Sequence, residues 1–224
     1  MSLNFKGLPF KTEWIEYPDI GPTLKRLGAP PTGKKPDGSD SYTLPAIYDS
    51  STNKYISDSI EIAKYLDETY PDTPKLIPQG TQAAIELFQT LFLQSVGNNL
   101  LSLVIAQTNA VLNERSEEYF RRTREASYKV KLEEIAPTGP KREQLWNSAK
   151  EGLGTIAGAL NKNGNGKLYY FGDTLSYADV ITVSFLYWVK VVLQENEEWR
   201  STVETWDSGR WGKLLEVTKP YFAV

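Results

Sequence analysis

An aspartate and a serine stand side by side where a helix is predicted to begin. Asp58-Ser59 follows the apolar segment Lys54–Ile56, and the next apolar residues, as far as Leu66, repeat with helical spacing. Free backbone N–H groups and the dipole at a helix N-terminus bind carboxylates. Ser59 can therefore hydrogen-bond a bound carboxylate, while Asp58 can hold a ligand ammonium group. The alternative is a plain helix cap, which the local residues alone favour.

A proline stands at the start of a short apolar strand, Leu44–Tyr48. A cis bond between Leu44 and Pro45 would turn the Leu44 backbone outward, where it can pair with an extended peptide. Because cis bonds are uncommon even before proline, these residues alone do not establish one.

A capping box is predicted at Ser176-Tyr-Ala-Asp179, ahead of a segment that is apolar on all sides. The Ser176 hydroxyl would accept from the backbone N–H of Asp179, and the Asp179 carboxylate would accept from that of Ser176. We interpret this pair as a structural cap of a buried helix, with no part in catalysis.

The amino-acid composition excludes several kinds of catalytic and metal site. The chain has 224 residues, no Cys and no His, which excludes Ser-His-Asp triads, Cys nucleophiles and Cys/His zinc sites. We predict no metal site, and the lack of disulfides favours a cytoplasmic origin. With 25 basic and 28 acidic side chains, the net charge of −3 gives no general attraction to nucleic acid or membranes. Six Trp and thirteen Tyr suit an aromatic-lined pocket.

The elements that must position these residues fall into two groups, which predicts an α+β fold. Up to residue 76 strand and helix signals mix, and from residue 79 the pattern is almost entirely helical, so we predict domains at 1–76 and 79–224. The first domain has a strand, a helix ended by Gly28 and capped by Asp19, and a hairpin, at Lys11–Tyr17, Ile20–Leu27 and Leu44–Ile56. The second has helices at 83–112, 116–135, 140–160 and 176–193.

The pattern of the first residues is typical of the C-terminal end of a helix. Ser2–Lys6 has an apolar face, Gly7 is a typical stop signal and Pro9 lies beyond it, yet no start signal precedes them. We therefore expect Met1 to lie inside an element whose first half is absent from the sequence. The alternative is a short frayed turn at an ordinary N-terminus.

Taken together, these motifs resemble the cytosolic glutathione transferases. The matching pieces are Leu44-Pro45, Asp58 to Leu66, and Phe171 to Asp179, and they span most of the chain. Residues 4–19 and 122–128 are similar to the fungal-specific FuA class. The resemblance implies a thioredoxin-like domain that binds glutathione, joined to an all-helical domain.

The resemblance also assigns roles to single residues. It implies that Pro45 is cis, that the Leu44 backbone pairs with the cysteinyl unit of glutathione, and that Asp58 and Ser59 hold the γ-glutamyl group. The stretch Thr32–Tyr42 would form an extra hairpin over the glutathione site. From charge and position, Lys34 and Lys35 would meet the glycyl carboxylate, and Ser176 and Asp179 match the family's helix cap.

One feature departs from the family pattern. Family members have a strand and a helix ahead of what is present here, with the catalytic Ser, Tyr or Cys between them. We therefore predict no catalytic residue in this chain and expect that residue to precede Met1. Either Met1 is an internal methionine taken as a start, which we favour, or the chain is a natural truncation.

Three functions remain open at this stage. The first is an enzyme that conjugates or de-conjugates hydrophobic aromatic compounds with glutathione as co-substrate. The second is a ligandin, which binds aromatic compounds and glutathione conjugates without turnover, and the third is a structural or regulatory protein. We expect a homodimer, of atypical geometry if the extra hairpin blocks the usual interface.

Overall fold

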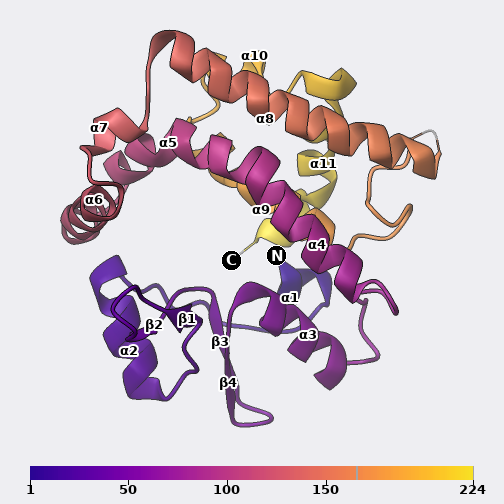
Figure 1. The fold of residues 1–224 in the computed structure, drawn as a ribbon. Helices are drawn as coiled ribbons and strands as arrows, with labels where there is room; N and C mark the ends of the chain where they lie inside the picture. The colour runs from indigo at the N-terminus through magenta and orange to yellow at the C-terminus, as the bar shows by residue number, and fades with distance from the viewer. Residues whose placement is uncertain (165, 224) are drawn as a thin grey trace.

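The computed structural model describes residues 1–164 and 166–223. Two layers face each other in Figure 1: the first 76 residues form the lower one, and the helices from α4 onward form the upper one. The two ends of the described chain lie between the layers. They touch, because the Asn4 carboxamide donates a 3.0 Å hydrogen bond to the backbone carbonyl of Tyr221.

The chain begins with the helix end that the sequence predicts. Helix α1 (Ser2–Phe5) stops at Gly7, whose φ of 66° closes the last turn. The strand predicted at Lys11–Tyr17 is wrong. No described strand pairs with this segment, Trp14 is 84% exposed, and the chain turns into a 3-10 helix, η1 (Tyr17–Asp19). Alternating residues do not make a strand where no neighbour offers ladder hydrogen bonds.

The rest of the lower layer follows the predicted order. Helix α2 (Ile20–Leu27) has Asp19 at its N-cap position and ends at Gly28, as predicted. The Asp19 carboxylate makes no hydrogen bond to the helix, however, because it pairs with Arg115. Two antiparallel hairpins come next, followed by helix α3. Their bounds are β1 (Gly33–Lys34), β2 (Asp40–Ser41), β3 (Ala46–Asp49), β4 (Lys54–Ser57) and α3 (Ser59–Thr69).

The upper layer is helical throughout. Two expected helices are divided: a π-helical turn interrupts the first, and the second breaks at Lys129, whose φ is 59°. No helix in the described residues is long and apolar enough to cross a bilayer. The bounds are α4 (Gln82–Phe92), η2 (Leu93–Gly97), α5 (Asn98–Ala110), α6 (Glu114–Tyr128), α7 (Leu132–Ile135), α8 (Gly139–Leu160), η3 (Asn161–Asn163), α9 (Tyr177–Val192), α10 (Glu197–Ser201), α11 (Trp206–Thr218) and η4 (Lys219–Phe222).

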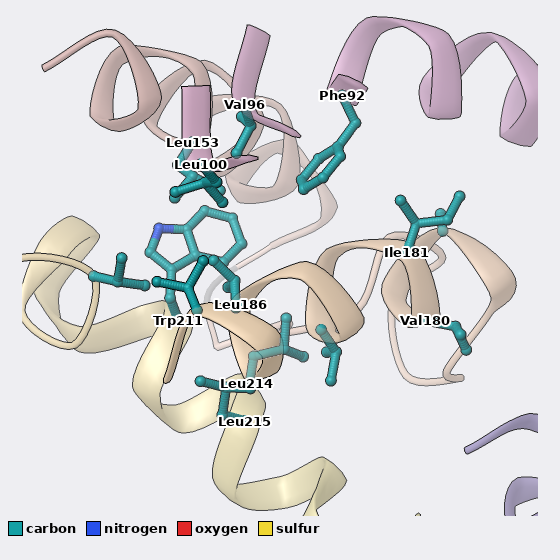
Figure 2. Close-up of a cluster of buried hydrophobic side chains, with 14 of the residues drawn as sticks. Phe92, Val96, Leu100, Leu153, Val180, Ile181, Leu186, Trp211, Leu214 and Leu215 are labelled. Atoms are coloured by element: carbon teal, nitrogen blue, oxygen red, sulfur yellow. The ribbon is translucent and has the colours of Figure 1, made fainter. Parts of the chain in front are cut away.

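The main core surrounds α9. Figure 2 shows the Trp211 indole beside Leu186 of α9 and below Leu100 and Leu153 of the neighbouring helices. Close helix approach depends on Gly152, because a Cβ there would lie 2.7 Å from the Ser95 carbonyl oxygen of η2. The core thus fixes α9 as the axis on which the helical layer is built.

A buried ion pair inside the lower layer holds the segment that contacts the helical layer. The Lys6 ammonium, whose side chain is fully buried, lies 2.7 Å from Oδ1 of Asp67 near the end of α3. The same carboxylate accepts the backbone N–H groups of Leu76 and Ile77, at 3.0 and 2.7 Å. Leu76 in turn accepts the backbone N–H of Tyr177 at 2.7 Å. One carboxylate therefore sets the path of the linker, residues 70–81 between α3 and α4, where it passes the start of α9.

The predicted capping box of α9 is present. Asp179 Oδ2 accepts from the backbone N–H and hydroxyl of Ser176, at 2.8 and 2.7 Å, and Oδ1 accepts the Tyr170 N–H at 3.0 Å. Burial raises the pKa of Asp179 to about 6, although these hydrogen bonds act in the opposite direction. The cap is thus a fully buried carboxylate that costs free energy to ionise.

Loss of the Lys6 ammonium is expected to destabilise the protein strongly. Lys6→Met leaves Asp67 without its counter-charge in the interior, so unfolding in urea should show a loss of about 3–5 kcal/mol. Lys11→Met is the matched control, because the Lys11–Glu13 pair is 87% and 79% exposed, and it should change stability by less than about 0.5 kcal/mol. Equal losses of stability in the two variants would contradict the role of Lys6 as the counter-charge of buried Asp67.

The cap also predicts a pH effect of definite sign. Since the folded pKa of Asp179 is about 6 and its ordinary value is 3.8, the folded state keeps this proton where the unfolded state has lost it. Asp179→Asn removes the titratable group. It also removes one hydrogen-bond acceptor, because the NH₂ group of Asn takes the place of one carboxylate oxygen and cannot accept from a donor. The stability advantage of the wild type over Asp179→Asn should fall from about pH 4 to pH 6 and then level off. An advantage that grows over this range would contradict the account.

Candidate functional site

Strand pairing brings two of the predicted motifs to one end of the β3–β4 hairpin. Ala46 pairs with Ser57, so Leu44-Pro45 and Asp58-Ser59 flank the same rung of the ladder. The Leu44–Pro45 bond is cis, as expected. Leu44 is 42% exposed, and among the described residues neither its N–H nor its C=O has a hydrogen-bond partner. An unpaired and accessible backbone unit therefore lies beside the start of α3.

Asp58 makes the turn from β4 into α3 and caps the helix. Its φ of 78° lies in the left-handed region, and its Oδ1 accepts the Ile60 N–H at 3.0 Å. The plain cap considered above is thus real, but it uses one oxygen only. Oδ2 has no hydrogen-bond partner in the described part of the chain, which leaves it available to a ligand cation.

Ser59 lies half-buried between the two layers. Its hydroxyl is beside the phenol of Tyr177, the first residue of α9. Burial raises the pKa of Tyr177 to about 12, with the Ser59 hydroxyl acting against this and the Asp58 charge adding to it. The helical layer therefore supplies one wall of the space around the Asp58-Ser59 pair, which the sequence did not predict.

A third polar group at this rung is also absent from the sequence prediction. Ser57 is 6% exposed, and its hydroxyl has no hydrogen-bond partner among the described residues. Buried hydroxyls are normally paired, so this group adds an unsatisfied polar atom next to Asp58. Its position at the strand end was visible in the sequence, but its burial depends on tertiary packing.

The two lysines lie on the predicted extra hairpin and differ in their surroundings. Lys34 Nζ lies 2.5 Å from Asp40 across the β1–β2 ladder, and this hydrogen bond raises the pKa of Lys34. Lys35 has no ion pair within the described residues. Neither lysine is connected to Asp58 or Ser59 by a hydrogen bond or ion pair there, so the structure places both on the hairpin and not at the ladder end.

A small apolar pocket opens where the π-helical turn meets α9. It has a volume of about 330 Å³, and its apolar lining side chains are Leu93, Leu101, Phe185 and Trp188. Gly97 keeps it open, because a Cβ there would lie 3.2 Å from the Phe185 ring. The pocket is large enough to accept an aromatic ring against the helical layer.

Known families match both layers. The glutathione S-transferase N-terminal domain matches residues 1–69, and the C-terminal domain of the same family matches residues 83–221. The chain belongs to the glutathione S-transferase family. The fold is that of this family, with a thioredoxin-like N-terminal domain and a helical C-terminal domain, as the resemblance implied. The unmatched residues, 70–82, include the predicted boundary between the two domains.

Solved transferases from fungi have the same fold. Glutathione transferase GSTFuA3 from Phanerochaete chrysosporium is 44% identical with a TM-score of 0.94, over 100% of this chain and 88% of its own. CsGST63524 of Ceriporiopsis subvermispora, crystallised in complex with glutathione, is 49% identical with the same TM-score and coverage. The glutathione S-transferase-like protein ustS of Aspergillus flavus is 35% identical over 198 residues, 84% of this chain and 70% of ustS. The resemblance to the fungal FuA class is thereby confirmed.

Proposed function

We propose that this transferase binds glutathione at the end of the β3–β4 hairpin. The observation that carries the proposal is the pairing of Ala46 with Ser57, which holds the free Leu44 backbone and the Asp58-Ser59 pair at one rung. A peptide can add to an unpaired backbone edge, and a helix N-terminus attracts a carboxylate. The glutathione bound to a solved relative supports the same ligand.

The chemistry of each group fits one part of the tripeptide. The Leu44 N–H and C=O would pair with the cysteinyl backbone. Asp58 Oδ2 would accept the γ-glutamyl ammonium, while the Ser59 hydroxyl and the first N–H groups of α3 would bind its α-carboxylate. Lys34 and Lys35 would meet the glycyl carboxylate, with Lys35 contributing more because Lys34 already neutralises Asp40.

Bound glutathione would act as a sulfur nucleophile. Its thiolate would attack an aromatic or other hydrophobic electrophile in the pocket lined by Phe185 and Trp188, forming a C–S bond as a leaving group departs or a double bond is saturated. In de-conjugation a second glutathione thiolate would attack the sulfur of the conjugate, forming the S–S bond of oxidised glutathione while the C–S bond breaks and the substrate carbon takes its electron pair and a proton. A hydroxyl that stabilises the thiolate is part of this chemistry, and the proposal assigns that role to none of residues 1–224.

Assembly and location are proposals of the same kind. We propose a homodimer that resides in the cytoplasm, from the family relationship and the lack of cysteine. Light scattering at several protein concentrations measures the oligomeric state directly.

Replacement of Asp58 tests the proposed ammonium site. Asp58→Asn keeps the helix cap, since Asn is an equally good N-cap, but removes the charge. Glutathione affinity by calorimetry should fall about tenfold or more, as expected for loss of a charged hydrogen bond. Glu61→Gln removes a charge from an exposed position on the same helix and should leave affinity within about twofold. Equal affinity of Asp58→Asn and the wild type would exclude this site.

The two lysines should differ in effect. Lys35→Gln is expected to weaken glutathione binding by about threefold, and Lys34→Gln by less, because Lys34 is paired with Asp40. The matched control ligand is glutathione esterified with an ethyl group at the glycyl carboxylate. Because this ester lacks the negative charge, it should bind Lys35→Gln and the wild type with equal affinity. The reverse order of effects would overturn the role of Lys35.

Turnover separates an enzyme from a ligandin. If the protein is an enzyme, glutathione with an aryl halide such as 1-chloro-2,4-dinitrobenzene should give a thioether whose absorbance rises with time. Tight binding of glutathione and S-hexylglutathione with no thioether across a panel of electrophiles would assign the ligandin function instead. Absence of glutathione binding would refute both.

A further inference from the structure

One side chain of the helical layer reaches the start of α3. Tyr177 is the first residue of α9 and is 3% exposed. Its phenol makes a hydrogen-bond contact with the hydroxyl of Ser59, the first residue of α3. The contact crosses the interface between the two domains. A residue of the helical domain therefore touches a side chain to which the proposed function gives a role in binding glutathione.

The partner of the Tyr177 phenol is unusual because it lies in the opposite layer. The Tyr170 hydroxyl is paired inside the helical layer, 3.0 Å from the Thr182 hydroxyl. Tyr65 and Tyr70 both donate to Asp49 inside the lower layer, at 2.7 and 2.6 Å. A buried phenol usually has a hydrogen-bond partner. For Tyr177 this partner is Ser59, so the position of α9 and that of the Ser59 hydroxyl are linked.

The Tyr177 side chain is held firmly in place. Its backbone N–H donates to the Leu76 carbonyl oxygen of the linker at 2.7 Å. The capping box of Ser176 and Asp179 fixes the same turn of α9. The ring itself belongs to the main core. Because a tyrosine ring has only two side-chain torsions, a packed ring leaves the hydroxyl little freedom to move. The phenol is thus a fixed point against which Ser59 can be oriented.

Protonation sets the direction of this hydrogen bond. Burial raises the pKa of Tyr177 to about 12, and the charge of Asp58 adds to the rise, although the Ser59 hydroxyl acts against it. The phenol therefore keeps its proton at neutral pH and can donate it to Ser59 Oγ. A serine hydroxyl has one proton and two lone pairs. When Ser59 accepts from Tyr177, its own proton is free for a third group.

The first turn of α3 offers further donors to such a group. The Ile60 N–H is taken by Asp58 Oδ1 at 3.0 Å. The N–H groups of Ser59 and Glu61 have no hydrogen-bond partner in the described part of the chain. Ser59 is half-buried, so a ligand can reach it. Backbone and hydroxyl donors at a helix N-terminus suit a carboxylate.

We propose that Tyr177 is a positioning residue for glutathione. Its phenol donates to Ser59 Oγ and so directs the Ser59 proton toward the α-carboxylate of the γ-glutamyl unit. Tyr177 acts through Ser59 and needs no contact with the ligand. The inference rests on the proposed glutathione site, and it adds that the helical domain takes part in recognising the γ-glutamyl end.

Calorimetry with two ligands on the full chain tests this role. The second ligand is 4-aminobutyryl-cysteinylglycine, which is glutathione without the γ-glutamyl α-carboxylate. Tyr177→Phe keeps the buried ring and removes only the hydroxyl, and it should weaken glutathione by about threefold to tenfold, the value of one hydrogen bond. The same substitution should leave the affinity for 4-aminobutyryl-cysteinylglycine within about twofold of the wild type, because that ligand has no carboxylate for Ser59 to meet.

A double variant tests whether Tyr177 acts through Ser59. Ser59→Ala removes the hydroxyl that Tyr177 is proposed to orient. Adding Tyr177→Phe to Ser59→Ala should therefore cause no further loss of glutathione affinity, since the two residues work as one unit. Independent, additive losses would contradict the proposed chain of hydrogen bonds.

Controls separate positioning from a general loss of packing. Tyr187→Phe removes a 40% exposed hydroxyl from the same helix and should leave glutathione affinity unchanged. Urea unfolding of Tyr177→Phe shows whether the variant is folded at the temperature of the titration. Equal weakening of both ligands by Tyr177→Phe would mean that Tyr177 only shapes the interface, and would overturn the proposal.

The wild type distinguishes failure of this inference from failure of the proposed function. If the wild type binds glutathione and Tyr177→Phe binds it equally well, the positioning role alone is refuted. If the wild type does not bind glutathione, the proposed site is refuted, and the role of Tyr177 is refuted with it.

Discussion

The carboxylate of Asp67 is the interaction on which the arrangement of the two domains depends. It neutralises the buried Lys6 ammonium and accepts two backbone N–H groups of the linker. The linker carbonyl of Leu76 then accepts the N–H of Tyr177, whose phenol lies beside Ser59. A buried ion pair is costly to desolvate, and it is tolerated here because every oxygen of the carboxylate is satisfied. The N-terminal end of α3 is thus held next to the first turn of α9.

The start of α9 shows a related balance between polar satisfaction and burial. Asp179 receives three hydrogen bonds, yet burial still raises its pKa to about 6. Near neutral pH the ionised carboxylate accepts hydrogen bonds from backbone N–H groups at the N-terminus of the buried helix. The charge that it holds inside the protein costs free energy. Asp67 and Asp179 are both buried, so the contact between the linker and the start of α9 depends on charges that neither domain places at its surface.

Local signals were sufficient for much of the fold. Gly7 and Gly28 end their helices with positive φ, Ser176 and Asp179 form the capping box, and Asp58 marks the turn from strand to helix. Each of these depends on residues within a few positions of one another. The cis bond at Leu44-Pro45 was expected only from the family resemblance, and local residues alone argued against it.

Features that depend on residues far apart in the chain could not be predicted from the sequence. The alternation at Lys11–Tyr17 satisfies a strand pattern, but a strand requires a neighbour, and the described structure offers none. The Lys6–Asp67 pair joins residues 61 positions apart. In the predicted site, sequence identified Leu44, Asp58 and Ser59, but not Tyr177 as a wall or Ser57 as a buried hydroxyl.

Hydrogen–deuterium exchange with and without saturating glutathione tests the central claim most directly. The account predicts slower exchange of the Leu44 amide and of the amides at the start of α3, because these groups gain ligand partners. Amides of α8, which contributes no residue to the proposed glutathione site, should be unaffected. Unchanged exchange at Leu44 and at residues 58–61, in a sample where calorimetry shows glutathione bound, would contradict the account.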